Sequence, residues 1–172
     1  MPCVIVIGGA PGCGKSTLAA ALRAHLRCPH IDFGKLREFH LQRDWSDASE
    51  REESMAFENL LGITRNYLRH GYEHVIIDDL RYPRVLEVPH VLSDVPVRIV
   101  TLILSDEAEL RRRIDKRTEG FRDADLAARW NGQILASPPK PGEARIDVAG
   151  KSPEDVLREA MDHLVQPPRP SA

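Results

Sequence analysis

The sequence has little cysteine and no long apolar run. Its three cysteines, Cys3, Cys13 and Cys28, are odd in number and none belongs to a C-x-x-C pair, so neither a disulfide framework nor a cysteine-based zinc site is indicated. No apolar stretch approaches the roughly 18 residues that a membrane-spanning helix needs. The first apolar segment is too short for a signal peptide and lacks a basic leader. These absences predict a cytoplasmic protein that has no membrane partner.

The chain also lacks a strong charge of either sign. Its 24 Lys and Arg residues oppose 26 Asp and Glu residues, which leaves a formal net charge of −2 over 172 residues. Because binding along nucleic acid depends on a strongly basic surface, this balance argues against an extended nucleic-acid footprint. The seven histidines show no metal-ligand spacing, and the N-K-x-D motif with which G proteins read their base is absent.

A phosphate-binding loop follows the first apolar segment. Residues 9–16 match G-x-x-x-x-G-K-[ST] in full, with a β-branched run before them and a helical pattern over residues 18–26. A glycine-rich turn that binds no ligand would rarely have both flanks. The predicted nucleotide-binding residues are Gly9, Ala10, Pro11, Gly12, Cys13, Gly14, Lys15, Ser16 and Thr17.

Each part of this loop has an expected role. The glycines let backbone N–H groups surround phosphate oxygens. Lys15 is expected at the β- and γ-phosphates, the Ser16 hydroxyl on Mg²⁺, and Thr17 near the α-phosphate. ATP and Mg²⁺ are therefore the predicted cofactors.

Strand and helix patterns alternate along the rest of the chain. Strands are predicted at 2–7, 30–32, 72–79, 98–104 and 144–148, and the main helices at 18–26, 50–70, 106–117, 124–135 and 153–164. Such alternation predicts an α/β fold whose parallel sheet has helices on both faces. One domain over residues 1–165 is expected, followed by a flexible proline-rich tail at 166–172.

Carboxylates end two of the predicted strands. Asp32 could accept the proton of an acceptor hydroxyl, or simply cap the helix that follows it. Of the adjacent pair Asp78 and Asp79, one should hold the Mg²⁺ shell, directly or through water. Asp78 is the metal candidate because it continues the strand, and Asp79 the candidate that faces the acceptor; helix capping is the alternative for each.

Two groups of arginines are candidates for binding phosphate. Arg113 and Arg117 lie four residues apart, so one helix face could carry both over the ATP phosphates, as a lid around 113–125. A charged helix face paired with nearby acids is the alternative. Three further arginines could bind an anionic acceptor, or be solvated or paired with carboxylates: Arg37, Arg81 and Arg84.

Together, the loop, Asp32, the strand that ends in Asp78 and Asp79, and the Arg113/Arg117 pair resemble the nucleoside monophosphate kinase-like group of P-loop kinases. Adenylate, gluconate and shikimate kinases, chloramphenicol phosphotransferase and polynucleotide 5′-hydroxyl kinase are members. The resemblance implies a five-stranded sheet in the order 2-3-1-4-5 and an arginine-bearing lid. Asp32 matches the catalytic aspartate of the hydroxyl kinases, which favours a hydroxyl acceptor.

A second likeness favours a nucleotide acceptor. Residues 76–84 are similar to the D-G-F-P-R segment of adenylate kinases and to a D-x-R segment of phage deoxynucleoside monophosphate kinases. The chain departs from the adenylate kinase form, because Asp79 replaces the glycine, an extra residue precedes the proline, and the short lid has no zinc cysteines.

The resulting hypothesis is an ATP-dependent phosphotransferase that acts on a small-molecule hydroxyl, with Asp32 as base and Lys15, Arg113 and Arg117 stabilising the transferring group. One alternative is a nucleoside monophosphate kinase that binds the acceptor phosphate through the three further arginines. A polynucleotide 5′-hydroxyl kinase and a nucleotide-dependent switch ATPase are the others. A homodimer is compatible with the sequence.

Overall fold

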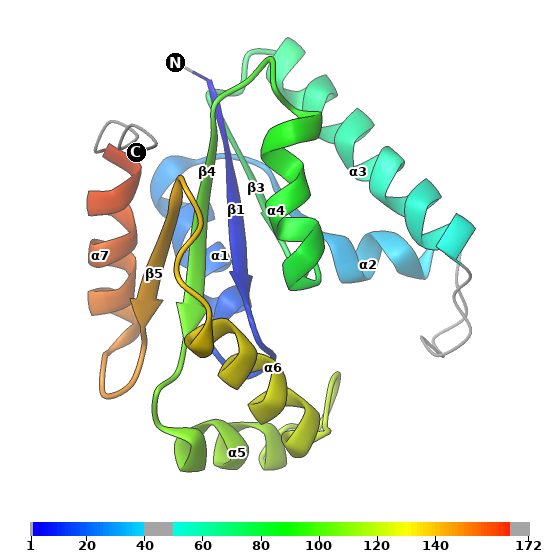
Figure 1. Cartoon of the computed structure of the whole chain (residues 1–172). Helices are drawn as coiled ribbons and strands as arrows, with labels where there is room; N and C mark the ends of the chain where they lie inside the picture. The colour runs from blue at the N-terminus through cyan, green and yellow to red at the C-terminus, as the bar shows by residue number, and fades with distance from the viewer. Residues whose placement is uncertain (1, 40–49, 166–172) are drawn as a thin grey trace.

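The sheet has the topology that the sequence predicts. The computed structural model describes residues 2–39 and 50–165. Its strands are β1 (Cys3–Gly9), β2 (His30–Asp32), β3 (His74–Asp78), β4 (Val97–Ile103) and β5 (Glu143–Asp147). They pair in the order β2-β3-β1-β4-β5, and every pair is parallel (Figure 1).

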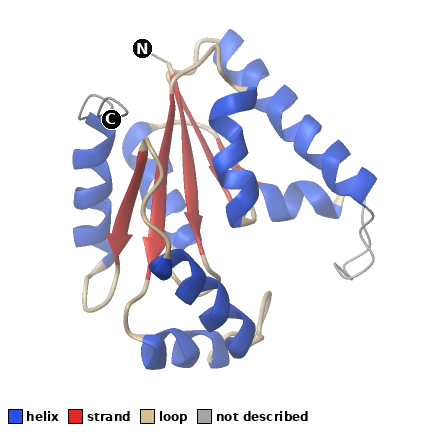
Figure 2. Cartoon of the chain, in the orientation of Figure 1, coloured by secondary structure: helices blue, strands red, loops and turns tan. Residues whose placement is uncertain are grey.

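Helices cover both faces of the sheet and the edge where its strands end. They are α1 (Lys15–Leu26), α2 (Phe33–Glu38), α3 (Glu50–Arg69), α4 (Tyr82–Val91), α5 (Glu107–Asp115), α6 (Ala124–Ala136) and α7 (Pro153–Val165). Helices α1 and α7 pack on one face, and α3 and α4 on the other. Helices α5 and α6 lie beyond the carboxyl ends of the strands, below the arrowheads in Figure 2.

Alternation along β1 builds the two cores. Val4 and Val6 join the core under α3 and α4, whereas Ile5 and Ile7 join the core under α1 and α7. All four side chains are buried, so β1 has no solvent face. A continuous apolar run is typical of a central parallel strand with helices on both faces.

Helix α4 is the element that the sequence analysis missed. Pro83 and Pro89 obscure its pattern, since proline is unfavourable in a helix interior. Pro83, however, lies in the first turn, where its missing N–H costs no hydrogen bond, and Pro89 lies in the last turn. Val85 and Val88 are fully buried against the sheet, so tertiary packing stabilises the helix.

Some expectations concern residues beyond these ranges or stay predictions. The tail at 166–172 lies outside the described residues, and the single domain remains a prediction. Within residues 2–39 and 50–165, no helix is both long and apolar enough to cross a membrane.

The core under α3 can be tested with a matched pair of leucines. Leu60 on α3 is 0% exposed and Leu135 on α6 is 41% exposed. We expect Leu60→Ala to lower the free energy of unfolding by about 2–5 kcal/mol, because it leaves a cavity. Leu135→Ala should change it by about 0.5 kcal/mol or less. Urea denaturation measures both, and equal effects would contradict the assigned core.

Candidate active site

The phosphate-binding loop leaves β1 in close contact with β4. Gly9, at the end of β1, has a φ of +130°. A Cβ at this position would lie 2.4 Å from the carbonyl oxygen of Leu102 on β4. Only glycine fits both the conformation and the space. The close approach of β1 to β4 therefore requires a glycine where the loop begins.

The first turn of α1 is open to an anion. Gly14 is its N-cap and provides no side-chain hydrogen bond to the helix, so the first backbone N–H groups are available to phosphate oxygens. Lys15 is buried, with its Nζ 3.4 Å from the Ala10 carbonyl oxygen and 3.9 Å from Asp79 Oδ1. Ser16 and Thr17 are exposed beside it. Of the predicted nucleotide-binding residues, Ser16 and Thr17 are therefore exposed, whereas Ala10, Cys13 and Lys15 are buried.

Asn131 of α6 connects the phosphate-binding loop with the end of β4. Its amide accepts a hydrogen bond from Leu104 N at 3.1 Å and donates one to Leu104 O at 2.7 Å. The buried Cys13 thiol lies 3.5 Å from Asn131 Oδ1. The sequence analysis missed Asn131, although a polar residue on the buried face of an apolar helix is a usable signal.

The adjacent carboxylates Asp78 and Asp79 have different surroundings. Asp78 is 0% exposed, and its Oδ1 lies 2.8 Å from His30 Nε2. Its Oδ2 is buried and has no hydrogen-bond partner among the described residues. The side chain of Asp79 is half-exposed and faces Lys15. Asp79 is therefore the one that a ligand can contact directly.

Loss of solvation raises the pKa of Asp79, and the Asp32 and Asp78 carboxylates raise it further, while Lys15 opposes them. A raised pKa means that Asp79 takes up a proton more readily than a free aspartate does. Perturbed titration of this kind is common at functional sites.

Asp32 caps helix α2, which is the alternative role that the sequence analysis gave it. Its Oδ1 accepts a hydrogen bond from Lys35 N at 3.0 Å, at the start of α2. No described residue donates a hydrogen bond to the other oxygen, Oδ2. Capping uses one oxygen, so it is compatible with an acceptor contact through the other.

Two of the three further arginines are already paired. Arg37 is buried, with its Nη2 3.0 Å from Glu53 Oε2. Arg84 lies 2.6 Å from Glu87 Oε2, and its guanidinium is 4.9 Å from the centre of the Phe57 ring. Arg81 is exposed and forms no ion pair with the described part of the chain.

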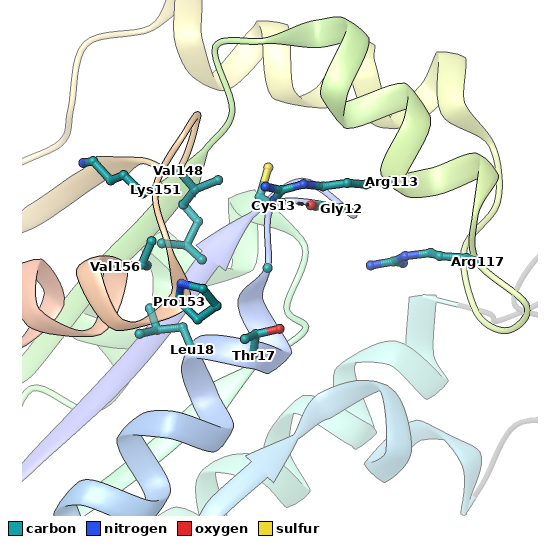
Figure 3. A pocket seen from close by; sticks show the side chains of 12 residues that line it. Gly12, Cys13, Thr17, Leu18, Arg113, Arg117, Val148, Lys151, Pro153 and Val156 are labelled. Carbon is teal, nitrogen blue, oxygen red and sulfur yellow. Dashed lines mark hydrogen bonds between the residues drawn. The ribbon is translucent and has the colours of Figure 1, made fainter.

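The two lid arginines, Arg113 and Arg117, line the same cavity, but only Arg113 lies in helix α5. Helix α5 ends at Asp115, two residues before the predicted end, so Arg117 follows its cap. Arg113 donates a hydrogen bond to Glu109 at 2.9 Å and another to the Gly12 carbonyl at 3.4 Å. Arg113 and Arg117 line one side of a cavity of about 370 Å³ (Figure 3).

The opposite wall of this cavity comes from β5 and α7. Figure 3 shows Val148, Pro153 and Val156 there, and Leu18 and Thr17 of α1 below them. Three apolar side chains facing two arginines suit a ligand with a flat apolar end and an anionic end. Sequence reasoning did not find this wall, because scattered apolar residues have no motif.

The residues at this edge fit Mg²⁺, which the fold family implies. Proteins hold Mg²⁺ through one or two carboxylates together with substrate phosphates. Ser16 offers an exposed hydroxyl, and Asp78 Oδ2 is a buried oxygen without a partner in the described ranges. No three His, Cys, Asp or Glu side chains in those ranges come together as a metal site of their own, which is consistent with an ion that depends on phosphate.

Residues 5–128 match a family described as an AAA domain. The chain belongs to the AAA domain family. A search of curated protein sequences gives no match.

Solved structures that include kinases share the fold of this AAA domain. A tunicamycin resistance protein from Deinococcus radiodurans superposes with a TM-score of 0.72 at 14% identity, covering 99% of this chain and 100% of the other. A sugar kinase from Janibacter sp. HTCC2649 gives 0.68 at 19% identity, covering 95% and 94%. A gluconokinase from Sinorhizobium meliloti 1021 gives 0.66 at 20% identity, covering 95% and 91%.

The thiol in the loop of this AAA domain should be inert. Burial raises the pKa of Cys13 to about 11, and the side chain is 1% exposed. At pH 8 only about one thiol in a thousand would be ionised, and the thiolate is the reactive form. We expect iodoacetamide to leave Cys13 unmodified in the folded protein and to modify it in urea, as read by peptide mass spectrometry. Fast labelling of the folded protein would contradict this burial.

Proposed function

We propose that this protein is an ATP-dependent phosphotransferase that moves the γ-phosphoryl group to the hydroxyl of a small molecule. One observation supports this above the rest: Asp79 Oδ1 is 3.9 Å from Lys15 Nζ of the phosphate-binding loop, and the carboxylates of Asp79 and Asp32 both lie next to Gly34. A carboxylate beside the γ-phosphate position suits activation of a hydroxyl. The fold shared with sugar kinase and gluconokinase is consistent with such a reaction.

The donor half would bind ATP through the loop and the cavity beside it. The open first turn of α1 and the Lys15 ammonium would bind the phosphates, and the apolar wall at Val148 and Pro153 would contact the base. Ser16 and Asp78 are the residues proposed to hold Mg²⁺, Ser16 through its exposed hydroxyl and Asp78 directly or through water. Bound Mg²⁺ would neutralise phosphate charge.

The transfer itself requires a base on the acceptor side. The acceptor oxygen would attack the γ-phosphorus as the bond to the β–γ bridging oxygen breaks, and ADP would leave with that electron pair. The hydroxyl proton would pass to Asp32 Oδ2. Arg113 and Arg117, on the lid side, would stabilise the charge on the transferring group.

A nucleoside monophosphate acceptor is less well supported. It would need cations that are free to bind its phosphate. Arg37 and Arg84 have carboxylate partners, so Arg81 is the candidate that forms no ion pair with the described residues. This charge balance favours an acceptor without a phosphate.

The reaction can be tested by coupled detection of ADP release. Acceptors in the panel would include sugars, cyclitols, nucleosides and nucleoside monophosphates, each confirmed by mass detection of the phosphorylated product. We expect turnover with an unphosphorylated hydroxyl compound and its loss in Lys15→Ala. Turnover with monophosphates alone would support the nucleotide kinase. A rate altered solely by a protein partner would support a switch ATPase.

Asp32→Asn tests the base without removing the cap, because asparagine caps helices as well as aspartate does. We expect kcat to fall by about 10²–10⁴-fold, the usual contribution of a general base. Nucleotide affinity should stay within about twofold, since Asp32 lies on the acceptor side. Asp162→Asn, at an exposed position on α7, is the control. Full turnover in Asp32→Asn would exclude Asp32 as base.

Arg113 and Arg111 lie on the same helix and provide a matched pair. Arg111 pairs with Glu107 and Asp125, away from the cavity that Arg113 lines. We expect Arg113→Ala to lower kcat by about 10²–10³-fold, because it removes a donor from the transferring phosphoryl group. Arg111→Ala should stay within about twofold. Similar losses in both variants would count against the lid assignment.

A further inference from the structure

The carboxylates of Asp32 and Asp79 converge on Gly34, in the first turn of α2. A Cβ on Gly34 would lie 2.4 Å from Asp79 Oδ2 and 3.1 Å from Asp32 Oδ1. The nearer approach is closer than van der Waals contact allows, so any other residue at position 34 would displace Asp79. The glycine therefore leaves room for two carboxylates to reach the same small region.

Asp79 connects this region to the phosphate side of the site. Its Oδ1 lies 3.9 Å from Lys15 Nζ, while its Oδ2 lies over Gly34. The side chain is half-exposed, which leaves the carboxylate accessible to a ligand. One carboxylate thus faces both the γ-phosphate position and the start of α2.

The backbone at Asp79 is strained. Its φ is +60°, one of two positive values at non-glycine residues in the described ranges. Glycine would adopt this conformation at lower cost. Strain of this kind persists where the surroundings require it, and it is common at functional sites. The conformation points to a need for the carboxyl group itself.

Two carboxylates meet next to Gly34, and Lys15, 3.9 Å from Asp79, offsets the charge of one of them. Arg37 and Arg84, the nearby buried and half-buried cations, already have Glu53 and Glu87 as partners. Two carboxylates that reach one region repel each other unless hydrogen-bond donors separate them. An anionic group would add to this repulsion. A neutral ligand with two adjacent O–H donors would relieve it.

We propose that the acceptor is a polyhydroxy compound with no negative charge near the reacting carbon, and that two neighbouring hydroxyls bind the two carboxylates. Asp32 takes the proton of the hydroxyl that attacks phosphorus. The neighbouring hydroxyl donates a hydrogen bond to Asp79 and is not changed by the reaction. Asp79 is then the residue that selects for adjacent hydroxyls, and Gly34 is the residue that makes this selection possible. The inference rests on the proposed function and names the substrate class of the same site.

Matched acceptors test the substrate class. Each pentose, hexose, cyclitol and ribonucleoside would be compared with the analogue that lacks the hydroxyl next to the reacting one and with its phosphate ester. We expect kcat/KM for the diol to exceed that for the deoxy compound by about tenfold or more, the effect of losing one hydrogen bond to a charged group. The phosphate ester should be a poorer acceptor than the diol, because it brings a negative charge to the two carboxylates.

Variants then test whether Asp79 is responsible for the preference. Asp79→Asn should lower kcat/KM for the diol towards that for the deoxy compound, whose own value should change little. Asp79→Gly should do the same while its melting temperature equals or exceeds that of the wild type, because glycine relieves the strain. A purely structural role for Asp79 would instead leave the preference unchanged.

Gly34→Ala has a matched control in Gly62→Ala. A Cβ at Gly62, on an exposed part of α3, would have no heavy atom within 4 Å. We expect Gly34→Ala to lower kcat/KM for the diol and Gly62→Ala to leave it within about twofold.

The outcomes separate this inference from the proposed function. Equal use of diol and deoxy acceptors, a preference for the phosphorylated compound, or an unchanged preference in Asp79→Asn would overturn the inference and leave the kinase intact. No ATP-dependent turnover with any acceptor would overturn both.

Discussion

The pairing of β1 between β3 and β4 is the constraint on which the site depends. Val6 of β1 is in register with Ile77 of β3 and Ile99 of β4, and Gly9 with Leu102. Because every strand is parallel, all carboxyl ends arrive at one edge of the sheet. Three parts of the site therefore meet at this edge: the phosphate-binding loop, the aspartates that end the strands, and the end of β4, which is bound by Asn131.

This edge divides into two electrostatic halves. On the lid side, Arg113 and Arg117 line the cavity with Lys151, so that side suits the phosphates of a nucleotide. On the α2 side, Arg37 and Arg84 pair with glutamates, and the carboxylates of Asp32 and Asp79 meet at Gly34. Lys15 lies between the halves, 3.9 Å from Asp79. A phosphoryl group that moves from the lid side to the α2 side would leave the arginines and approach the carboxylates. Those carboxylates suit a neutral hydroxyl as the acceptor.

The local patterns were reliable where a residue's role depends on its neighbours in the chain. The Gly-rich loop, the N-cap at Asp32 and the apolar run of β3 follow from short-range rules, and the structure has all three. Helix α4 was missed because Pro83 and Pro89 dominate its local pattern, whereas burial of its valines against β1 and β4 decides its structure. Tertiary packing often overrides local propensity in this way.

Ion pairing of the arginines likewise could not be predicted from local sequence patterns. The sequence identified Arg37 and Arg84 as phosphate binders or as members of ion pairs and could not choose between them. Glu53, the partner of Arg37, is 16 positions away on α3, so the pair forms only when α2 and α3 pack together. Charge on one side chain is a local property, but its neutralisation depends on the fold.

The sequence by itself determined that a glycine-rich loop lies between a buried strand and a helix, and that the sheet is parallel with carboxylates at the strand ends. These features follow from backbone conformation and hydrophobic periodicity, which short segments encode. Only the tertiary structure decided which carboxylate is buried beside His30, which one faces Lys15, and that Gly34 lets two of them converge. Solvation and the distances between charges depend on the packing of segments far apart in the chain, so no local pattern encodes them.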